Sequence, residues 1–375
     1  MRPTSTTHEA ALPRQRIEGL DGLRAIAVTI VVLLHGGVLP WGWVGVDLFF
    51  CLSGFLITGI LLDSKDGMAS TRHILVAFYI RRSLRIFPLA LLAVLVMAIA
   101  TGAGWSAAWY ATYVVNWFPY HLPAPRDLAH YWSLAVEEQY YLLWPLLVLR
   151  LSPRSVMRAA FLLVAGGIVT RAALVHFDPP FATTYFLHSA TIIRADGLLI
   201  GSILAVMLRM ARTDTLKDYA WHAGRLMVYS MLVAATFEWL LGVNPGGHAV
   251  EVAFALSQTA LALGFGCLLF LVAFHPPRWI RNRWLVGIGT ISYGIYVIHG
   301  CLMYWLRPVR DAGLRTALLF VLSVALAYAS WRCFESPLLA LKRRWPMPAI
   351  RSPGRLASAA SHESSTRETA IASSR

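Results

Sequence analysis

An arginine and a histidine flank an apolar run in residues 21–37, DGLRAIAVTIVVLLHGG. Arg24 and His35 are eleven residues apart, so an α-helix places them on one face, roughly 16 Å apart along its axis. A neutral imidazole can accept a proton near neutral pH, and charged groups inside apolar segments often serve function. In the structural alternative, Arg24 extends to the membrane interface and His35 caps the helix. We favour a functional His35 and keep both interpretations of Arg24.

A second polar group lies in the stretch HYWSLAVEEQYYLLWP, which begins at residue 130. Ser133, Glu137 and Tyr141 follow one another at helical spacing and form a stripe. The two adjacent glutamates are either solvated at a membrane boundary or part of a lined cavity, and a polar stripe that continues into an apolar segment favours the cavity. A carboxylate beside His35 would fix its tautomer and stabilise the imidazolium. Glu137 is our first candidate for this role, and Glu138 is the second.

Three arginines occur within five positions of FYIRRSLRIFP, at the start of a long apolar run. Arg81 and Arg85 share a helical face, and Arg82 flanks them. Membrane proteins generally carry basic residues at cytoplasmic ends of helices. Guanidinium groups bind phosphates in a bidentate manner, however, and a helix start also favours an anion. We therefore predict a phosphate-binding site at these three residues.

Six further polar side chains inside apolar runs are predicted to line a substrate cavity: Asp47, Arg194, Asp196, Ser292, Tyr296 and His299. The last three share one helical face. Arg194 and Asp196 are expected to pair with each other or to face Glu137, because buried charges need partners. We interpret Ser53 as a packing hydroxyl rather than a nucleophile, since no G-x-S-x-G motif surrounds it.

Arg332 and Glu335 occur in the stretch WRCFESP, near the end of the last apolar run. Two interpretations stay open for them, a structural ion pair and a functional pair, and we predict the structural one. No metal site and no tightly bound cofactor are expected from the residue pattern.

The composition is that of a membrane protein. Hydrophobic residues make up 57% of the 375 residues and charged residues only 14%, whereas soluble domains are about one quarter charged. The net charge of +14 fits basic cytoplasmic loops and does not require nucleic acid as a partner. The four cysteines lie in apolar stretches and are interpreted as small core residues.

About ten apolar runs are long enough to cross a bilayer, at 22–39, 42–62, 78–101, 132–149, 156–176, 189–209, 222–243, 249–274, 286–306 and 314–334. The predicted fold is an all-α polytopic bundle with both termini in the cytoplasm, because all but six of the 33 Lys and Arg then lie inside. Residues 1–16 are expected to be a disordered N-terminal segment and 341–375 a basic, Ser/Ala-rich disordered cytoplasmic tail. Residues 17–340 form the predicted membrane domain.

Several motifs in this order resemble those of the acyltransferase-3 family of integral-membrane O-acyltransferases. The matching stretches are LDGLRAIAVTIVVLLH, GVDLFFCLSGFLIT, FYIRRSLRIFP, YWSLAVEEQYYLLWP, RADGLLIGS, SYGIYVIH and FESP. The resemblance implies that an acyl group, usually acetyl, moves from cytoplasmic acyl-CoA to a hydroxyl of lipopolysaccharide, exopolysaccharide or another cell-surface carbohydrate. Some members act on a small molecule such as a macrolide.

The resemblance also implies that His35 is the catalytic base, that Arg24 belongs to the same site and that the protein resides in a bacterial inner membrane. Direct transfer and an acyl-histidine relay both remain open, as does the oligomeric state. The main alternative is a transporter or flippase of a lipid-linked sugar, since intramembrane charges fit that function too. The absence of a visible internal repeat argues against it.

Overall fold

Helices form every regular element in the described part of the computed structural model, which comprises residues 14–67, 69–118, 124–177, 189–210, 219–243, 248–274 and 276–347. The predicted all-α class is therefore confirmed for these residues. The expected disorder of residues 1–16 and 341–375 falls mostly on 1–13 and 348–375, which lie outside the described residues. Residues 14–16 are instead part of α1, and Leu341–Arg344 form a 3-10 helix.

The long helices follow eight of the predicted apolar runs closely, whereas the runs 189–209 and 286–306 are each divided between a short helix and a longer one. The long helices are α1 (Arg14–Gly36), α2 (Val44–Lys65), α3 (Thr71–Thr101), α5 (Tyr131–Arg150), α6 (Pro153–Phe177), α9 (Asp196–Met210), α11 (Tyr219–Val243), α12 (His248–Phe274), α14 (Ser292–Trp305) and α15 (Ala312–Ser330). Short helices join them: α4 (Ala108–Ala111), α8 (Thr191–Arg194), α13 (Arg283–Thr290) and α16 (Ser336–Ala340).

Fewer of these helices qualify as membrane spans than we predicted. Six helices of the described chain are long and apolar enough to cross a bilayer, or seven if α13 and α14, bent by 66°, count as one span. Helix α9 has only 15 residues, or about 22 Å, which is short of the roughly 30 Å hydrocarbon core. The ten-span count and the cytoplasmic termini stay predictions.

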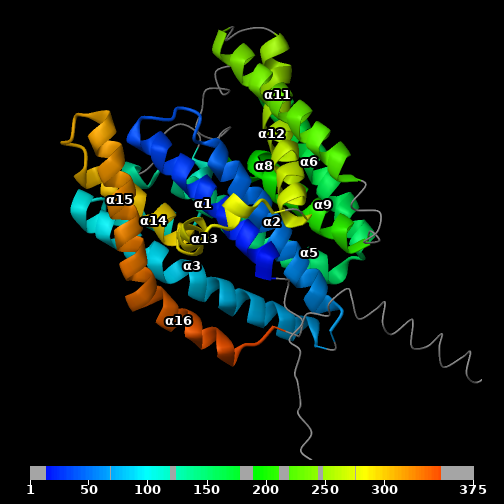
Figure 1. The fold of residues 1–375 in the computed structure, drawn as a ribbon, viewed down its shortest axis with the longest axis horizontal. Coiled ribbons are helices and arrows are strands. Elements are labelled where there is room, and N and C mark those ends of the chain that lie inside the picture. Colours follow the sequence, from blue (N-terminus) through cyan, green and yellow to red (C-terminus); the bar gives the residue numbers. More distant parts are fainter. Residues whose placement is uncertain are drawn as a thin grey trace, which may run out of the picture.

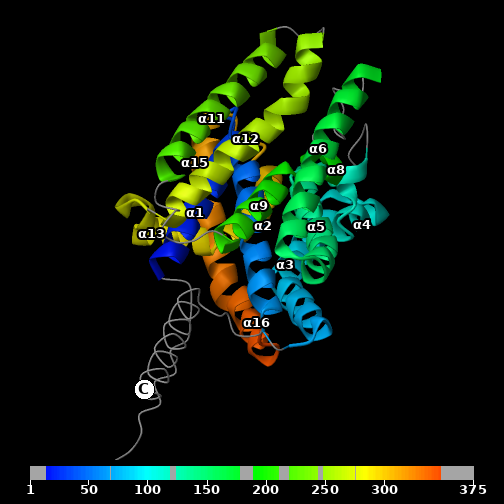
Figure 2. The same ribbon diagram turned by 90° about the vertical axis from the view of Figure 1, so that its right-hand side faces the viewer.

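Helices α1 and α2 occupy the centre of the bundle (Figure 1). Helix α1 contacts α2, α12, α13, α14 and α15, whereas α2 contacts α5, α9 and α12. Helices α11 and α12 form a long pair at one end of the molecule, as the two views in Figures 1 and 2, 90° apart, show. The two central helices therefore contact most of the other long helices directly.

Local sequence fixes both ends of α3, the helix that carries the arginine cluster. The side chain of Ser70 caps its start by accepting a hydrogen bond from the backbone N–H of His73. Its end is Gly102, which has a φ of +66° in the left-handed region that glycine adopts without strain. These caps place the arginine cluster, Arg81, Arg82 and Arg85, in the third and fourth turns of the helix.

Close contact between α2 and α9 orients the polar face of α2. A side chain at Gly54 would overlap the backbone carbonyl of Leu198 on α9, so only glycine allows this approach. Because consecutive helical residues are about 100° apart, Ser53 faces a different neighbour. This neighbour is α5, whose Glu137 accepts its hydrogen bond.

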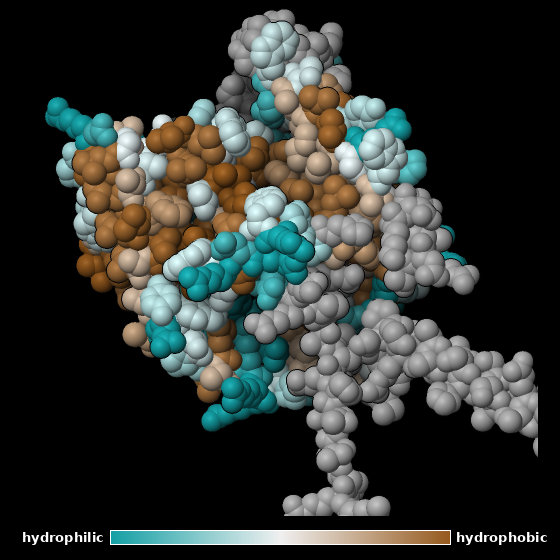
Figure 3. Space-filling view, in the orientation of Figure 1, coloured by the Kyte–Doolittle hydropathy of each residue, from teal (hydrophilic) through white to brown (hydrophobic). Residues whose placement is uncertain are grey.

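Large apolar side chains cover much of the outer surface (Figure 3). Ile99 is 75% exposed and Leu162 is 73% exposed. Hydrophilic side chains gather over α13 and at the end of α16 in the same view, where the chain carries Arg278, Arg281, Arg283, Lys342, Arg343 and Arg344. An apolar belt of this extent beside a basic rim is the surface expected of a bundle that faces lipid.

Candidate active site

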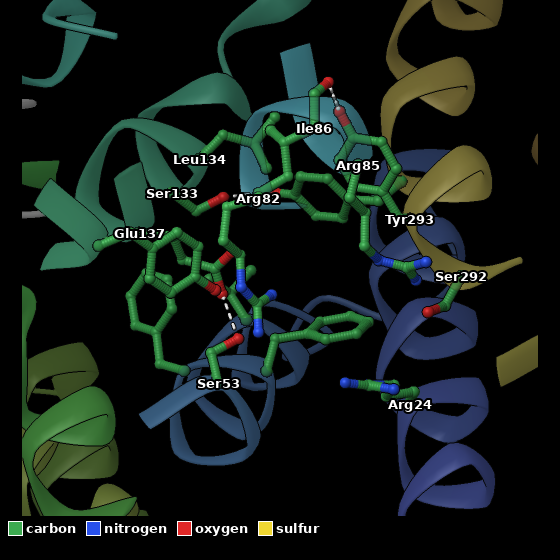
Figure 4. A pocket seen from close by; sticks show the side chains of 15 residues that line it. Arg24, Ser53, Arg82, Arg85, Ile86, Ser133, Leu134, Glu137, Ser292 and Tyr293 are labelled. Atoms are coloured by element: carbon green, nitrogen blue, oxygen red, sulfur yellow. Dashed lines mark hydrogen bonds between the residues drawn. The ribbon is translucent and has the colours of Figure 1, made fainter. Parts of the chain in front are cut away.

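A cavity of about 90 Å³ lies where α1, α2, α3, α5 and α14 meet (Figure 4). Its polar lining consists of Arg24, Ser53, Arg82, Arg85, Ser133, Glu137, Tyr141, Ser292, Tyr293 and Tyr296. Its apolar lining consists of Val46, Phe49, Phe50, Ile86 and Leu134. Five segments that are far apart in sequence thus build one polar cavity inside a helical bundle.

Three guanidinium groups face this cavity. Arg82 and Arg85 project from adjacent turns of α3, and Arg24 approaches from α1 (Figure 4). Arg24 also forms an ion pair with Asp21 at 2.9 Å, one turn earlier on the same helix. Three cations around one small space create a strong preference for an anionic ligand group.

The structure corrects the predicted arginine cluster at Arg81. Its guanidinium donates to the backbone carbonyls of Lys342 at 3.1 Å and Trp345 at 3.3 Å, so it holds the C-terminal segment against α3. Arg81 shares a helical face with Arg85, but these two carbonyls engage its guanidinium and it is not part of the cavity lining. The pair that faces the cavity is Arg82 and Arg85.

The carboxylate of Glu137 lines the same cavity as the arginines. Ser53 Oγ donates a hydrogen bond to Glu137 Oε1 at 2.8 Å (Figure 4), so the serine that we interpreted as a packing hydroxyl lines the cavity. Glu138 lies outside the lining, and its Oε1 is buried without a hydrogen-bond partner among the described residues. We predicted that Glu137 fixes the tautomer of His35, which would require contact between the two side chains. In the structure, the hydrogen-bond partner of Glu137 is Ser53 instead.

A tyrosine and a serine close the cavity at its far end. Tyr296 Oη and Ser133 Oγ are 2.5 Å apart, and Tyr296 also donates to the backbone carbonyl of His130 at 3.0 Å. The Tyr296 ring lies 5.5 Å from the ring of His299, centroid to centroid. Tyr296, which lines the cavity, therefore also contacts His130 and His299, which lie outside the lining.

Three histidines form a cluster beyond this pair. His299 Nε2 is 3.2 Å from His35 Nδ1, and the ring of His130 lies 4.7 Å from that of His299 and 6.3 Å from that of His35. His299 is fully buried and His130 is 5% exposed, whereas His35 is partly buried. Arg24 and His35 thus occupy one face of α1. Arg24 lines the cavity, and His35 belongs to the histidine cluster.

His130 was not among the residues predicted for the site. Its ring packs against α14 where Gly300 lacks a side chain, and a Cβ at that position would overlap the ring. The available signal was its spacing, since His130 precedes Ser133 by three residues and Glu137 by seven, at the helical period of the same stripe. His130 Nε2 is buried without a partner in the described chain. No cluster of described residues has the geometry to hold a metal ion.

Comparison with known proteins identifies the family of this chain. A family model described as an acyltransferase domain matches residues 17–332. The chain belongs to this acyltransferase family. It is therefore a multi-pass membrane member of the family, in agreement with its apolar helices.

Several curated relatives of the acyltransferase are O-acetyltransferases by name. The putative peptidoglycan O-acetyltransferase YrhL of Bacillus subtilis is 29% identical over 365 residues, covering 86% of this chain and 55% of the relative. The peptidoglycan O-acetyltransferase OatA of Listeria monocytogenes is 28% identical, covering 87% of this chain and 56% of the relative. The O-acetyltransferase OatA of Staphylococcus aureus is 27% identical, with 86% and 57% covered. The chain spans little more than half the length of these relatives, and no solved structure gives a significant match.

The structure corrects the predicted cavity-lining role of three residues in the acyltransferase. Arg194 Nη2 pairs with Asp47 at 3.1 Å, and Asp196 pairs with Arg171 at 2.6 Å; all four side chains are buried away from the cavity lining. Of the two arrangements expected for Arg194 and Asp196, pairing with each other is wrong because the helix breaks at Ala195, between α8 and α9. Their observed ion-pair partners are Asp47 and Arg171 rather than Glu137. The two side chains consequently point to different helices, Arg194 to α2 and Asp196 to α6.

The predicted ion pair between Arg332 and Glu335 is also wrong. Glu335 is buried and accepts a hydrogen bond from Ser330 at 3.0 Å, whereas Arg332 is exposed. Residues 331–335 form a π-helical turn, in which residues three apart no longer lie above one another.

The predicted polar face of α14 is present. Ser292 and Tyr296 line the cavity, and His299 continues the same face one turn later to reach His35. This face links the two halves of the site, although the roles of its side chains stay predictions.

Proposed function

We propose that the chain is an integral-membrane O-acyltransferase that moves an acetyl group from cytoplasmic acyl-CoA to a hydroxyl of a cell-surface carbohydrate. The observation that supports this function is a cavity with three guanidinium groups, joined through Tyr296 to a buried histidine cluster. An anion site suits the phosphates of the donor, and an imidazole suits removal of a hydroxyl proton. The cytoplasmic membrane of a bacterium is the proposed location.

The size of the cavity supports a short acyl group. Pockets that enclose drug-sized ligands measure about 300–1,000 Å³, whereas this cavity measures about 90 Å³. An acetyl thioester fits such a space, but the nucleotide end of the donor does not. The phosphates are therefore bound at the mouth, by Arg82, Arg85 and Arg24, while the thioester points toward Tyr296.

The names of the relatives support a carbohydrate acceptor. Two of them are described as peptidoglycan O-acetyltransferases, so we add peptidoglycan to the lipopolysaccharide and exopolysaccharide that the resemblance implies. A small-molecule acceptor such as a macrolide is the alternative.

The proposed chemistry uses His35 as a general base. Its unprotonated nitrogen takes the proton of the acceptor hydroxyl, the oxygen attacks the thioester carbonyl carbon, and the carbon–sulfur bond breaks. The coenzyme A thiolate then receives the proton from His35, which restores the neutral imidazole. Exclusion of water by the surrounding helices limits wasteful hydrolysis of the thioester.

Substitution of His35 tests this function. Loss of a general base typically lowers the rate by about 10² to 10⁴. We expect His35→Ala to reach the membrane at normal abundance and to transfer almost no acetyl group from labelled acetyl-CoA to isolated cell-wall glycan or polysaccharide. His35→Gln keeps size and a hydrogen bond but not basicity, and should fail nearly as badly.

Other outcomes would contradict the proposal. An active His35→Gln enzyme would remove His35 from the mechanism. Wild-type protein that transfers no acetyl group to any of these acceptors but moves a lipid-linked sugar across vesicles would identify a flippase instead.

A further inference from the structure

The backbone of two helices determines where the protons of His35 and His299 reside. His35 Nδ1 is 3.0 Å from the carbonyl oxygen of Val31, and His299 Nδ1 is 3.2 Å from that of Ile295. A carbonyl oxygen can only accept a hydrogen bond, so each Nδ1 must carry a hydrogen. Both imidazoles are consequently held as the same tautomer.

The contact between the two rings then has a defined direction. Neutral His299 with a hydrogen on Nδ1 has a lone pair on Nε2, and this atom is 3.2 Å from His35 Nδ1. His35 Nδ1–H therefore donates to both the Val31 carbonyl and His299 Nε2. The lone pair of His35 remains on its Nε2.

The other tautomer of His35 does not satisfy this arrangement. If the hydrogen were on Nε2, the Nδ1 lone pair would face the Val31 carbonyl oxygen and the His299 Nε2 lone pair, with no hydrogen among the three acceptors. Buried acceptors without a donor are costly. His299 thus reinforces the tautomer that the α1 backbone already favours.

We propose that His299 is a positioning residue that holds His35 in the Nδ1–H tautomer, with Nε2 directed toward the acceptor hydroxyl. This inference rests on the proposed function of His35 as the base. It replaces the carboxylate partner expected from the sequence, because Glu137 is engaged with Ser53. An uncharged partner still accepts the Nδ1–H bond when His35 becomes an imidazolium, but it does not neutralise the cation. The proton is therefore free to return to the departing thiolate.

His299 itself lacks the freedom to act as the base. Its Nδ1–H is donated to Ile295, its Nε2 accepts from His35, and the residue is 0% exposed. Neither nitrogen is left for a hydroxyl of the acceptor. Positioning and proton transfer are thus divided between the two histidines.

A pair of glutamine variants separates these roles. The amide oxygen of His299→Gln can accept the hydrogen bond from His35 Nδ1–H, whereas His299→Leu cannot. In membranes that hold the full chain, we expect His299→Gln to keep kcat for acetyl transfer within about tenfold of wild type. We expect His299→Leu to lose about 100-fold or more in kcat with an unchanged KM for acetyl-CoA, and His35→Gln to be inactive.

Two results would overturn the assignment. Equal inactivity of folded His299→Gln and His35→Gln would mean that His299 carries the proton itself, and a fully active His299→Leu would mean that it positions nothing. If the leucine variant fails to fold, the contrast between the two glutamine variants still decides.

A second measurement does not depend on acetyl transfer. Protein labelled with ¹⁵N-histidine should show, in the difference spectrum between wild type and His35→Gln, an Nδ1-protonated imidazole for His35. An Nε2-protonated signal would refute the inference even if the protein proves not to be an acyltransferase. Absence of acetyl transfer by wild type, with the expected ¹⁵N signal present, would instead refute the proposed function alone.

Discussion

Arg82 and Arg85 provide the sharpest test of where the donor binds, because Arg81 is a matched control next to them. All three guanidinium groups belong to two turns of α3, yet only Arg82 and Arg85 line the cavity. Arg81 is occupied by two backbone carbonyls of the C-terminal segment. Replacing each arginine by alanine removes the same chemical group from two different environments.

The expected magnitude follows from the bonds that are lost. A hydrogen bond to a charged group contributes about 1.5–3 kcal/mol, and about 1.36 kcal/mol corresponds to a factor of ten. Loss of one phosphate contact at Arg82 or Arg85 should therefore raise the Kd for acetyl-CoA roughly 10- to 150-fold. Arg81→Ala should leave Kd within about threefold and lower the melting temperature instead, because it frees the C-terminal segment.

Equilibrium binding of labelled acetyl-CoA to the purified full chain measures these effects without an acceptor. Thermal unfolding of the same samples shows whether each variant is folded. Unchanged binding in folded Arg82→Ala and Arg85→Ala would mean that the arginines only set topology. An equal loss in Arg81→Ala would place the phosphates at the predicted three-arginine cluster after all.

Two further predictions concern the packing around the site. Gly300→Ala should displace the His130 ring and destabilise the protein by about 1–3 kcal/mol, which thermal unfolding would show as a lower melting temperature. Gly287→Ala is the control, because nothing lies within 4 Å of the new Cβ, and it should not lower the melting temperature. Equal stability of the two variants would contradict the close contact between Gly300 and His130. Asp47→Ala should leave the buried Arg194 guanidinium without its carboxylate partner, with the Gln258 amide oxygen still accepting a hydrogen bond from it, at a cost of about 3–5 kcal/mol. Its loss of acetyl transfer should therefore match its loss of folded protein in the membrane, and lost activity at normal abundance would return Asp47 to the substrate cavity.

Much of the helical architecture is predictable from the sequence because a membrane leaves few alternatives. Backbone groups in hydrocarbon must be paired within the segment, so each long apolar run becomes a helix. Eight of the ten predicted runs fall on one continuous helical segment, whereas 189–209 is divided between α8 and α9 and 286–306 between α13 and α14. The number of spans is harder to predict, because a short helix such as α9 and a polar one such as α5 can be buried in protein instead of facing lipid.

The helical period also predicts which side chains share a face. Arg24 with His35, and Ser292 with Tyr296 and His299, are examples on single helices. The period does not tell which helix lies opposite that face. His35 and His299 are 264 residues apart, and Ser53 and Glu137 are 84 apart. No local pattern connects such pairs, so the carboxylate expected beside His35 was assigned to the wrong partner.

Ser53 shows the same limit at one position. In the stretch CLSGF, a serine beside a glycine is typical of close helix packing. In the structure the two residues contact different helices. Gly54 packs on Leu198 of α9, and Ser53 donates a hydrogen bond to Glu137 of α5. The crossing of α2 with α9 decides which of the two residues, Ser53 or Gly54, faces the cavity.

One helix carries both ends of the proposed reaction path, and this has a mechanical consequence. The eleven residues between Arg24 and His35 hold the anion site and the base roughly 16 Å apart, at a separation set by the helical rise rather than by a flexible loop. A helix of 23 residues packed on five neighbours cannot change this distance by bending alone. The thioester must therefore travel to the base, past the hydrogen-bonded pair of Ser133 and Tyr296. Tyr296 lines the cavity and contacts His299. It therefore separates the cavity from the histidine cluster, and an acyl group would have to pass it to reach the tautomer-fixed His35.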